Sequence, residues 1–297
     1  MGRVWDVVVV GAGAAGLSAA QAVAERGLAC LCIDRLGPGG ALMNLGPLHH
    51  CPDLPEGMTG PDLAAQLTDA ATGAGAELGF GEVRAIRGGD PWIVATDEEE
   101  HAARALILAT GLAPGRLGVP GEEGFEGMGL SHCAACDGPL YRGQAVVVAG
   151  SDEWACQEAL ELAATAAQVT LVHAEDAPPA TLPAPPPNLA VMPGRILALE
   201  GEAGLEAVVV ARGGARHRLA ARAVFVQCNR LPALDFAPGL VALDAGGHPL
   251  VDAAMRTSLG TVFAVGDLRA GAPTRLAAAM ADGRRAGEAA AGALAGG

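Results

Sequence analysis

The sequence predicts an α/β fold built from Rossmann-type β–α–β units, and three observations support this class. Residues 4–10 form an almost continuous apolar, β-branched run, as expected of a parallel strand covered on both faces. The run Gly11 to Gly16 (GAGAAG) follows at once and leads into an alanine-rich helix that ends at about Arg26. A second strand, residues 29–33, ends in Asp34, close to the distance expected for an acid that contacts a ribose.

The glycines of this first unit have distinct tasks. Gly11 permits a tight turn, Gly13 lets the backbone approach a pyrophosphate at the helix N-terminus, and Gly16 allows close packing of helix on strand. The carboxylate of Asp34 would repel a ribose 2′-phosphate, so the unit suits FAD or NAD better than NADP. The alternative is a glycine-rich turn without a ligand, which the complete strand, turn, helix and acid make the weaker interpretation.

A third segment with dinucleotide-site character lies near the C-terminus. Residues 260–266 (GTVFAVG) predict a buried strand that ends in Gly266-Asp267, followed by a helix from about residue 274 to 294. A carboxylate beside a helix N-terminus could bind the ribityl hydroxyls of a flavin. An ordinary capping or turn aspartate is the alternative.

A pair of cysteines carries the second chemical signal. Cys133 and Cys136 are separated by two alanines and followed by Asp137. Two thiols at this spacing can close a disulfide across one turn, and Asp137 is suited to handle a proton. Structural cysteines are the alternative. Zinc would need a second ligand pair, which His132 and His173 do not provide, so no metal site is predicted.

Composition narrows the range of partners. The 297 residues are 51% hydrophobic, contain no lysine and carry a net charge of −14, which disfavours nucleic acid and anionic membranes. Seven cysteines without a secretory signal indicate a reducing, cytoplasmic location. Five of them lie in scattered apolar segments and are predicted to be core residues, with Cys51 the least certain of the set: Cys30, Cys32, Cys51, Cys156 and Cys228.

The motifs, taken together and in order, resemble the low-molecular-weight thioredoxin reductases over nearly the whole chain. The segments between them agree with that family as well: residues 52–67 (PDLPEGMTGPDLAAQL), 109–111 (ATG) and 117–129 (LGVPGEEGFEGMG). The resemblance implies a homodimer with an FAD domain formed by residues 1–113 and 239–297. It also implies an inserted NADPH-type domain, residues 114–238, that carries the cysteines.

The resemblance also implies roles for single residues. Cys136 would face the flavin, Cys133 would exchange with the substrate disulfide, and Asp137 would be the proton-transfer acid. The family carries glutamine at the positions of Ala41 and Leu276, which weakens side-chain contacts without excluding FAD. The positions that would line FAD are Gly11, Gly13, Gly16, Asp34, Gly40, Leu42, Asn44, Thr110, Gly111, Gly266, Asp267, Arg275, Leu276 and Ala277.

The inserted domain departs from the family where NADPH should bind. After a strand at residues 145–148, Asp152 replaces the second glycine of the expected turn and Glu153 follows it. After the strand at residues 169–172, Ala174 and Glu175 stand where the family has two arginines for the 2′-phosphate. An intact fold with an inactive nucleotide site is therefore predicted, and use of NADH or of a shifted geometry is the alternative.

The predicted function is that of a flavin-dependent thiol–disulfide oxidoreductase that works without NADPH. Its partner would be a thioredoxin-like protein or a small dithiol or disulfide. Two NADPH-independent offshoots of the family fit: ferredoxin-dependent flavin thioredoxin reductases, and the oxygen-using dithiol oxidases of holomycin and gliotoxin biosynthesis. The oxidases usually carry histidine where this chain has Asp137. An NAD(P)H-dependent thioredoxin reductase and a non-catalytic flavoprotein redox sensor stay open, and the proline-rich residues 177–187 predict a rigid loop or a docking edge.

Overall fold

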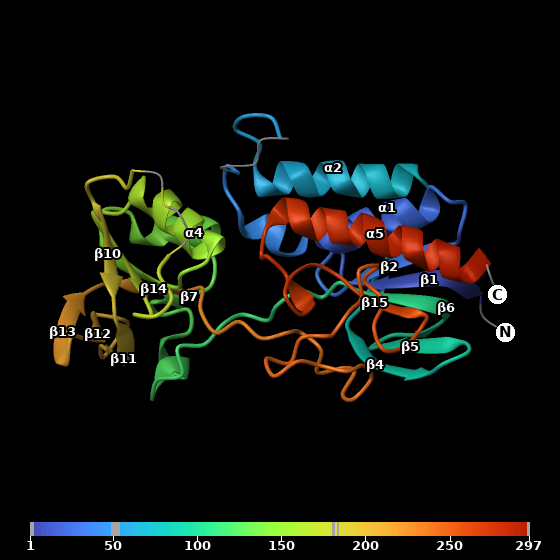
Figure 1. Cartoon of the computed structure of the whole chain (residues 1–297). Helices are drawn as coiled ribbons and strands as arrows, with labels where there is room; N and C mark the ends of the chain where they lie inside the picture. Colours follow the sequence, from blue (N-terminus) through green and yellow to red (C-terminus); the bar gives the residue numbers. More distant parts are fainter. Residues whose placement is uncertain (1–2, 49–53, 180–181, 183, 296–297) are drawn as a thin grey trace. The chain divides into compact units, whose positions relative to one another are not determined.

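The chain folds into two compact units (Figure 1). The computed structural model describes residues 3–48, 54–179, 182 and 184–295. The first unit comprises residues 1–43, 50–113 and 231–297, and the second comprises residues 44–49 and 114–230. The chain therefore starts in the first unit, builds most of the second and returns.

The return to the first unit comes at Leu231, whereas the sequence analysis placed it at residue 239. The N–H of Ala113 donates to the Leu231 carbonyl at 2.8 Å, and the N–H of Ala233 donates to the Gly111 carbonyl at 3.1 Å. These backbone bonds tie the returning chain to the outgoing one, so residues 231–238 belong with the first unit.

The first unit is a seven-stranded sheet covered by helices. The strand order is β3-β2-β1-β6-β5-β4, with β15 beside β6, and Figure 1 shows α1, α2 and α5 gathered on one face. The strands are β1 (Val4–Val10), β2 (Cys30–Asp34), β3 (Glu77–Phe80), β4 (Val83–Gly88), β5 (Trp92–Thr96), β6 (Glu100–Leu108) and β15 (Val262–Ala264). The helices are α1 (Ala14–Ala24), α2 (Gly60–Gly73) and α5 (Leu276–Ala295), with the 3₁₀ turns η1 (Gly40–Asn44) and η4 (Gly266–Leu268).

Parallel pairing brings the carboxyl ends of four strands to one edge of this sheet. Val10 lies beside Ile33 of β2 and Leu108 of β6, and Ala264 of β15 also lies beside Leu108. The predicted strand at residues 4–10 is confirmed residue for residue. Because ligands of open parallel sheets bind outside the carboxyl ends of the strands, this edge is where the first unit's site belongs.

The second unit has a five-stranded parallel sheet and a three-stranded antiparallel one. The parallel order is β10-β9-β8-β14-β7, and the antiparallel order is β11-β12-β13. The strands are β7 (Leu130–Ser131), β8 (Ala145–Ala149), β9 (Gln168–His173), β10 (Leu189–Pro193), β11 (Arg195–Glu200), β12 (Ala207–Arg212), β13 (Ala215–Ala220) and β14 (Ala223–Val226). The helices are α3 (Ala134–Asp137) and α4 (Glu153–Ala163), with the 3₁₀ turns η2 (Glu122–Phe125) and η3 (Gly138–Tyr141).

The register of the second sheet sets three functional segments at one edge. Ala149 of β8 lies beside Val172 of β9 and Val226 of β14, and Phe225 lies beside Ser131 of β7. The turn into α4, the residues after β9 and the cysteine segment after β7 therefore all follow carboxyl ends of neighbouring strands.

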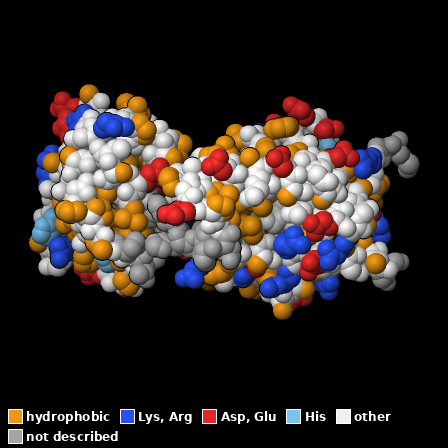
Figure 2. Space-filling model, turned by 90° about the horizontal axis from the view of Figure 1, so that it is seen from above, with side chains coloured by type: hydrophobic (Ala, Val, Ile, Leu, Met, Phe, Trp, Pro, Cys, Tyr) orange, Lys and Arg blue, Asp and Glu red, His pale blue; other side chains and the backbone are white. Residues whose placement is uncertain are grey.

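The surface over the helices of the first unit mixes both signs of charge, as Figure 2 shows from above. Arg284 of α5 bonds Glu25 at the end of α1 at 3.3 Å, and Arg26 bonds Glu288 of α5 at 3.2 Å. These exposed pairs add little stability singly. No helix within the described ranges is long and apolar enough to cross a membrane.

Glycines hold α5 against α1. A Cβ added at Gly283 would lie 2.1 Å from the Ala15 carbonyl oxygen, and one at Gly287 would lie 2.7 Å from the Ala19 carbonyl oxygen. A Cβ at Gly292, on the same helix, would meet no described atom within 4 Å. Close contact of the two helices therefore requires glycine at the first two positions and not at the third.

We expect Gly283→Ala to destabilise the protein by about 1–3 kcal/mol, because the added methyl group forces the helices apart. Gly292→Ala is the matched control and should be neutral or stabilise by about 0.5–1 kcal/mol, since alanine favours helix. Denaturant unfolding of the FAD-loaded proteins measures both. Equal stability of the two variants would contradict the assigned packing.

Candidate active site

The turn between β1 and α1 is shaped to receive an anion. Gly11 has φ +101°, and a Cβ there would lie 2.5 Å from the Ala109 carbonyl oxygen. A Cβ at Gly16 would lie 1.8 Å from the Gly11 carbonyl oxygen, so the helix passes close to the turn. At Gly13, however, an added Cβ would meet no described atom within 4 Å. The N-terminus of α1 thus opens onto free space, which suits a diphosphate.

Asp34 is fixed at the end of β2 by backbone donors. Its carboxylate accepts from the N–H groups of Ala12 and Leu36, both at 2.9 Å, and of Gly37 at 3.2 Å. The carboxylate therefore links the glycine turn to the loop after β2, as well as marking the predicted ribose position.

A cavity of about 520 Å³ lies beside Asp34 in the first unit. It is lined by Arg35, Leu36, Phe80, Gly81, Glu82, Asp97 and Glu98. Leu36 and Phe80 are largely exposed, with 85% and 69% of their surface accessible. Neither apolar side chain was predicted from the sequence. Leu36 follows Asp34 closely and could have been found, whereas Phe80 reaches the site only because β3 pairs with β2.

The other glycines of the predicted cofactor set adjoin the same turn. A Cβ at Gly40 would lie 3.2 Å from the Gly13 Cα atom, and one at Gly266 would lie 3.0 Å from the Ala15 Cβ atom and 3.6 Å from that of Ala279. The turn that carries Asp267 and the first turn of α5 are thus both close to α1. Arg275 directly precedes α5, and Leu276 and Ala277 begin it.

A partly buried ion pair lies beside the Asp267 turn. Arg269, just after η4, donates to both carboxylate oxygens of Asp282 on α5 at 2.6 and 3.3 Å.

The predicted cofactor positions after β6 lie in the first unit. Thr110 donates its hydroxyl to the Ala233 carbonyl at 2.7 Å, and Gly111 has φ +64°. Of the predicted cofactor positions, Asn44 is the one grouped with the second unit.

Cys133 and Cys136 form a disulfide with a Cα–Cα distance of 5.3 Å. Cys133 is the N-cap of α3, and its Sγ atom accepts the N–H of Cys136 at 3.1 Å. Cys133 is buried, with 8% of its surface accessible, whereas Cys136 is exposed. The Sγ atom of Cys136 lies 3.9 Å from Asn44 Oδ1. The bond from the Cys136 N–H would stabilise a thiolate at Cys133 after reduction.

Asp137 is positioned by a serine that the sequence analysis did not single out. The Ser131 hydroxyl donates to the Asp137 carboxylate at 2.7 Å, and it accepts the N–H of Cys133 at 3.1 Å. Burial raises the pKa of the nearby Tyr141 hydroxyl, and the negative charge of Asp137 raises that pKa further. Ser131 lies two residues before Cys133, so its closeness in the sequence could have identified it as a site residue.

A second missed residue lies behind α3. Glu158 of α4 is completely buried and accepts the Ala134 N–H at 3.1 Å and the Gln227 side-chain N–H at 2.9 Å. Gln227 also donates to the His132 carbonyl at 3.0 Å. Burial raises the pKa of the Glu158 carboxyl to about 7 against the lowering effect of these two bonds. Glu158 and Gln227 thus anchor both sides of Cys133.

The N-terminus of α4 is occupied by the chain itself. Asp152 is the N-cap residue, and its carboxylate accepts the Ala155 N–H at 2.8 Å. The same carboxylate forms an ion pair with Arg230, whose guanidinium lies 5.7 Å from the centre of the Trp154 ring. Where α1 presents an open glycine, α4 therefore presents a carboxylate that is already bonded on both sides.

The residues after β9 offer no positive charge. The His173 ring contacts the carbonyl of Ala174 at 2.8 Å, and His173 is buried. Ala174, Glu175 and Asp176 are exposed. The predicted replacement of two arginines by a neutral and an acidic residue therefore lies on the surface, at the end of the strand beside β8.

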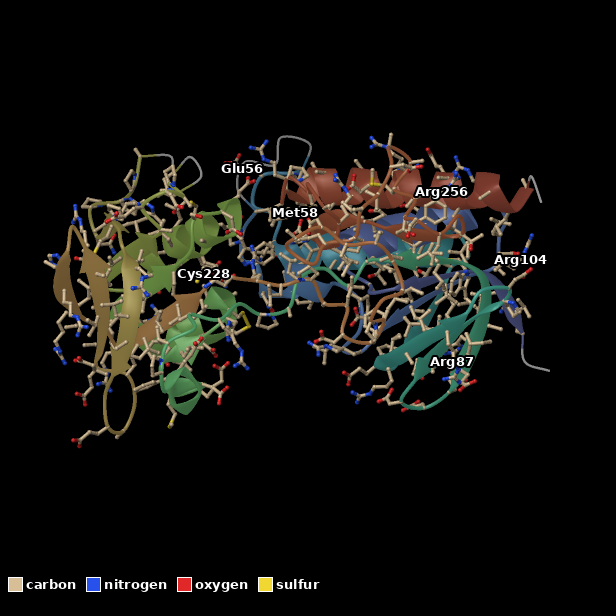
Figure 3. The ribbon with its side chains drawn as sticks, turned by 60° about the horizontal axis from the view of Figure 1, so that its bottom comes forward. Glu56, Met58, Arg87, Arg104, Cys228 and Arg256 are labelled. Atoms are coloured by element: carbon tan, nitrogen blue, oxygen red, sulfur yellow. A yellow bond between two sulfur atoms is a disulfide. The ribbon has the colours of Figure 1, made fainter. Side chains whose placement is uncertain are left out.

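The described cysteines outside the disulfide are buried or half-buried. Cys30, Cys32 and Cys156 are buried, and burial raises the pKa of Cys30 to about 12. Cys228, labelled in Figure 3, follows β14 and is half-buried, and burial raises its pKa to about 11. Cys51 lies outside the described residues.

Two dinucleotide-type α/β units, one of them bearing a disulfide between cysteines three residues apart, are typical of flavin-dependent disulfide oxidoreductases. The family model for pyridine nucleotide-disulphide oxidoreductases matches residues 5–185. The chain belongs to this family, within the group of low-molecular-weight thioredoxin reductases, and is an FAD-dependent disulfide oxidoreductase.

Individual relatives support the same assignment. The chain is 35% identical to a thioredoxin reductase of Treponema pallidum over 97% of its own length and 96% of the relative's. It is 37% identical to a thioredoxin reductase of Mycolicibacterium smegmatis over 89% and 88%. Its fold is similar to the crystal structure of Lactococcus lactis thioredoxin reductase (FR conformation), with a TM-score of 0.92, 29% identity, and coverage of 98% and 99%.

Glu158→Gln should remove a pH-dependent part of the folding stability. A folded pKa of about 7, above the ordinary 4.5, means that the stabilisation by the proton is complete below pH 4.5 and is lost as the pH rises through 7. At about 1.4 kcal/mol per pKa unit, the loss is roughly 3 kcal/mol.

Unfolding free energies from denaturant titrations between pH 5 and 8 test this expectation. The wild type should lose stability relative to Glu158→Gln as the pH rises, while Glu206→Gln, which removes an exposed carboxylate of the same unit, should follow the wild type. Parallel curves for wild type and Glu158→Gln would show that Glu158 titrates normally.

Proposed function

We propose that this protein passes electrons between FAD and a substrate dithiol or disulfide through Cys133 and Cys136, without using NADPH. The observation that carries the proposal is the carboxylate of Asp152 at the N-terminus of α4. Thioredoxin, which the relatives' names give as their substrate, or a protein like it, is the first candidate partner. A small dithiol or disulfide is the second, and a homodimer is proposed on the family resemblance alone.

Steric occupation is the main reason to exclude NADPH. A pyrophosphate needs the free N–H groups of the helix's first turn, and Asp152 already accepts one of them. Displacing its side chain would break that bond and the ion pair with Arg230. A helix cap contributes about 1 kcal/mol and a partly buried ion pair adds to it, so the dinucleotide would have to offset both.

Negative charge after β9 further weakens binding of the adenosine end of NADPH. Glu175 and Asp176 are exposed where a 2′-phosphate would need cations. A like-charge pair at 4 Å costs about 4 kcal/mol at an effective dielectric constant of 20, and less when solvated. A micromolar dinucleotide has about 8 kcal/mol of binding free energy, so losses of this size lead to millimolar affinity or weaker.

The first unit contains the residues that would hold FAD. The open turn at Gly13 suits the diphosphate, Asp34 with the cavity beside Leu36 and Phe80 suits the adenosine, and the Asp267 turn suits the ribityl chain. Bound FAD supplies two-electron chemistry at the disulfide. The further positions proposed to line it are Gly11, Gly16, Gly40, Leu42, Asn44, Thr110, Gly111, Gly266, Arg275, Leu276 and Ala277.

The exchange step assigns a separate task to each cysteine. The Cys133 thiolate attacks a substrate disulfide, a mixed disulfide forms, and one substrate thiolate leaves and takes a proton. Cys136 then attacks the Cys133 sulfur, which releases the second substrate thiol and restores the disulfide. Asp137, held by Ser131, is placed to move the proton. Run in reverse, the same steps oxidise a substrate dithiol.

An anaerobic titration followed by flavin absorbance separates the candidate functions. Each electron source is added alone: NADPH, NADH, dithiothreitol or reduced ferredoxin. Bleaching by dithiothreitol and ferredoxin supports a reductase with a protein donor. Bleaching by dithiothreitol alone, reversed quickly by air with formation of oxidised dithiol, supports a dithiol oxidase. Bleaching by none of them supports a redox sensor.

NADPH should not reduce the flavin of this protein. Micromolar NADPH should leave the flavin oxidised over minutes, because the turn after β8 and the residues after β9 give it no site. Dithiothreitol is the internal control and should bleach the same sample through the cysteine pair. Rapid bleaching by one equivalent of NADPH would overturn the proposal and leave an NADPH-dependent thioredoxin reductase.

Single serine variants should distinguish the roles of the two cysteines. Cys133→Ser leaves Cys136 as a lone thiolate beside the oxidised flavin and should give a long-wavelength charge-transfer band, whereas Cys136→Ser should give none. Cys136→Ser should still form a mixed disulfide with a disulfide reagent through Cys133. Both variants should lose turnover. A charge-transfer band in Cys136→Ser, or full activity in either variant, would reverse the assigned roles.

A further inference from the structure

Glu158 differs from the other buried carboxylates of the described residues. Three such carboxylates occur, those of Glu122, Glu158 and Asp282. Glu122 accepts three successive backbone N–H groups in its own loop, and Asp282 has the guanidinium of Arg269 as its partner. Glu158 instead reaches from α4 to the cysteine segment, and its two donors, a peptide N–H and an amide, are neutral.

The hydrogen bond between Glu158 and the Ala134 N–H lies next to Cys133. Ala134 is the first residue of α3, and Cys133 is the cap of that helix. The N–H of Cys136 bonds the Cys133 sulfur at 3.1 Å and would stabilise a thiolate there. Glu158 accepts the neighbouring N–H, that of Ala134, and sets a negative charge behind the residue next to Cys133. An ionised Glu158 therefore opposes a thiolate at Cys133.

We propose that Glu158 is a positioning residue that binds a proton when the Cys133–Cys136 disulfide is reduced, and that it thereby sets the pH dependence of this reduction. In the balanced step, two electrons from a donor dithiol break the S–S bond and the donor becomes a disulfide. Of its two protons, one goes to the sulfur that becomes a thiol. The other goes to Glu158, which balances the charge of the remaining thiolate.

The surroundings of Glu158 support this proton uptake. Burial already raises its pKa to about 7 in the disulfide form. Glu161 on the same helix raises it further, whereas the positive charge of Arg230, after β14, lowers it. The remaining neighbours from packed elements are the Ala134 N–H and the neutral Gln227 amide. A new negative charge at Cys133 would raise this pKa again, through like-charge repulsion.

The test measures how readily the disulfide is reduced in wild type, Glu158→Gln and Glu206→Gln. Each full-length, FAD-loaded protein is equilibrated without oxygen in mixtures of reduced and oxidised dithiothreitol from pH 6 to 8.5. Acid quenching, alkylation and mass spectrometry then give the reduced fraction of Cys133 and Cys136. Titrations common to all three proteins cancel when their equilibrium constants are divided.

The ratio of the Glu158→Gln constant to the wild-type constant should rise about five- to tenfold between pH 6 and 8.5, for one pKa unit of coupling. The ratio for Glu206→Gln should stay flat. A flat ratio for Glu158→Gln would overturn the inference, since a purely structural role shifts the constant equally at every pH.

The inference rests on the redox role of the cysteine pair proposed above, and the two fail differently. If dithiothreitol does not reduce the pair in the wild type at any pH, the proposed function fails and takes the inference with it. If the pair equilibrates normally but the ratio is flat, the inference alone fails. NADPH takes no part in either outcome.

A measurement on the wild type covers the case in which Glu158→Gln does not fold. Infrared difference spectra of the oxidised and reduced protein at pH 8 should show the carbonyl stretch of a protonated carboxylic acid appearing on reduction. Absence of that band would overturn the inference without any variant.

Discussion

The first turn of the helix that follows a parallel strand is the feature on which this structure depends. Such a turn presents N–H groups without partners, and these must be met by an anion, by water or by the chain itself. In the first unit, Gly13 leaves the turn of α1 open. In the second, Asp152 fills the turn of α4 with its own carboxylate, and Arg230 neutralises that charge. One chain thus contains the same β–α unit in an open and in a closed form.

Although Asp152 fills the first turn of α4, the sheet of the second unit still has a role. The parallel sheet sets the cysteine segment after β7 beside the end of β14, and α4 supplies Glu158 behind it. The side chains that fill this core stay apolar and buried, including Val148, Leu171 and Phe225. If the second unit binds no NADPH, as proposed, it still serves as the scaffold of the disulfide, because the same strands and helix position Cys133 and Cys136.

The sequence predicted what depends on neighbours along the chain. The strand at residues 4–10, the glycine turn and the disulfide all arise from contiguous residues, and the structure has each of them. Asp152 was predicted to inactivate the nucleotide site, but its partner Arg230 comes from far along the chain, so the ion pair that neutralises Asp152 was not predicted. Glu158 and Gln227 were missed for the same reason, since only the fold brings them to the cysteine segment. The chain returns to the first unit at Leu231, earlier than predicted, because of backbone bonds that composition does not reveal.

Calorimetric titration of NADPH into the FAD-loaded, oxidised protein tests most directly whether the self-capped turn excludes the dinucleotide. Binding is measured independently of electron transfer, so a slow flavin cannot hide an occupied site. The account predicts no saturable heat up to a ligand concentration of about 1 mM, which corresponds to a binding free energy no better than about −4 kcal/mol. A saturable isotherm with a micromolar dissociation constant and one site per chain would contradict it.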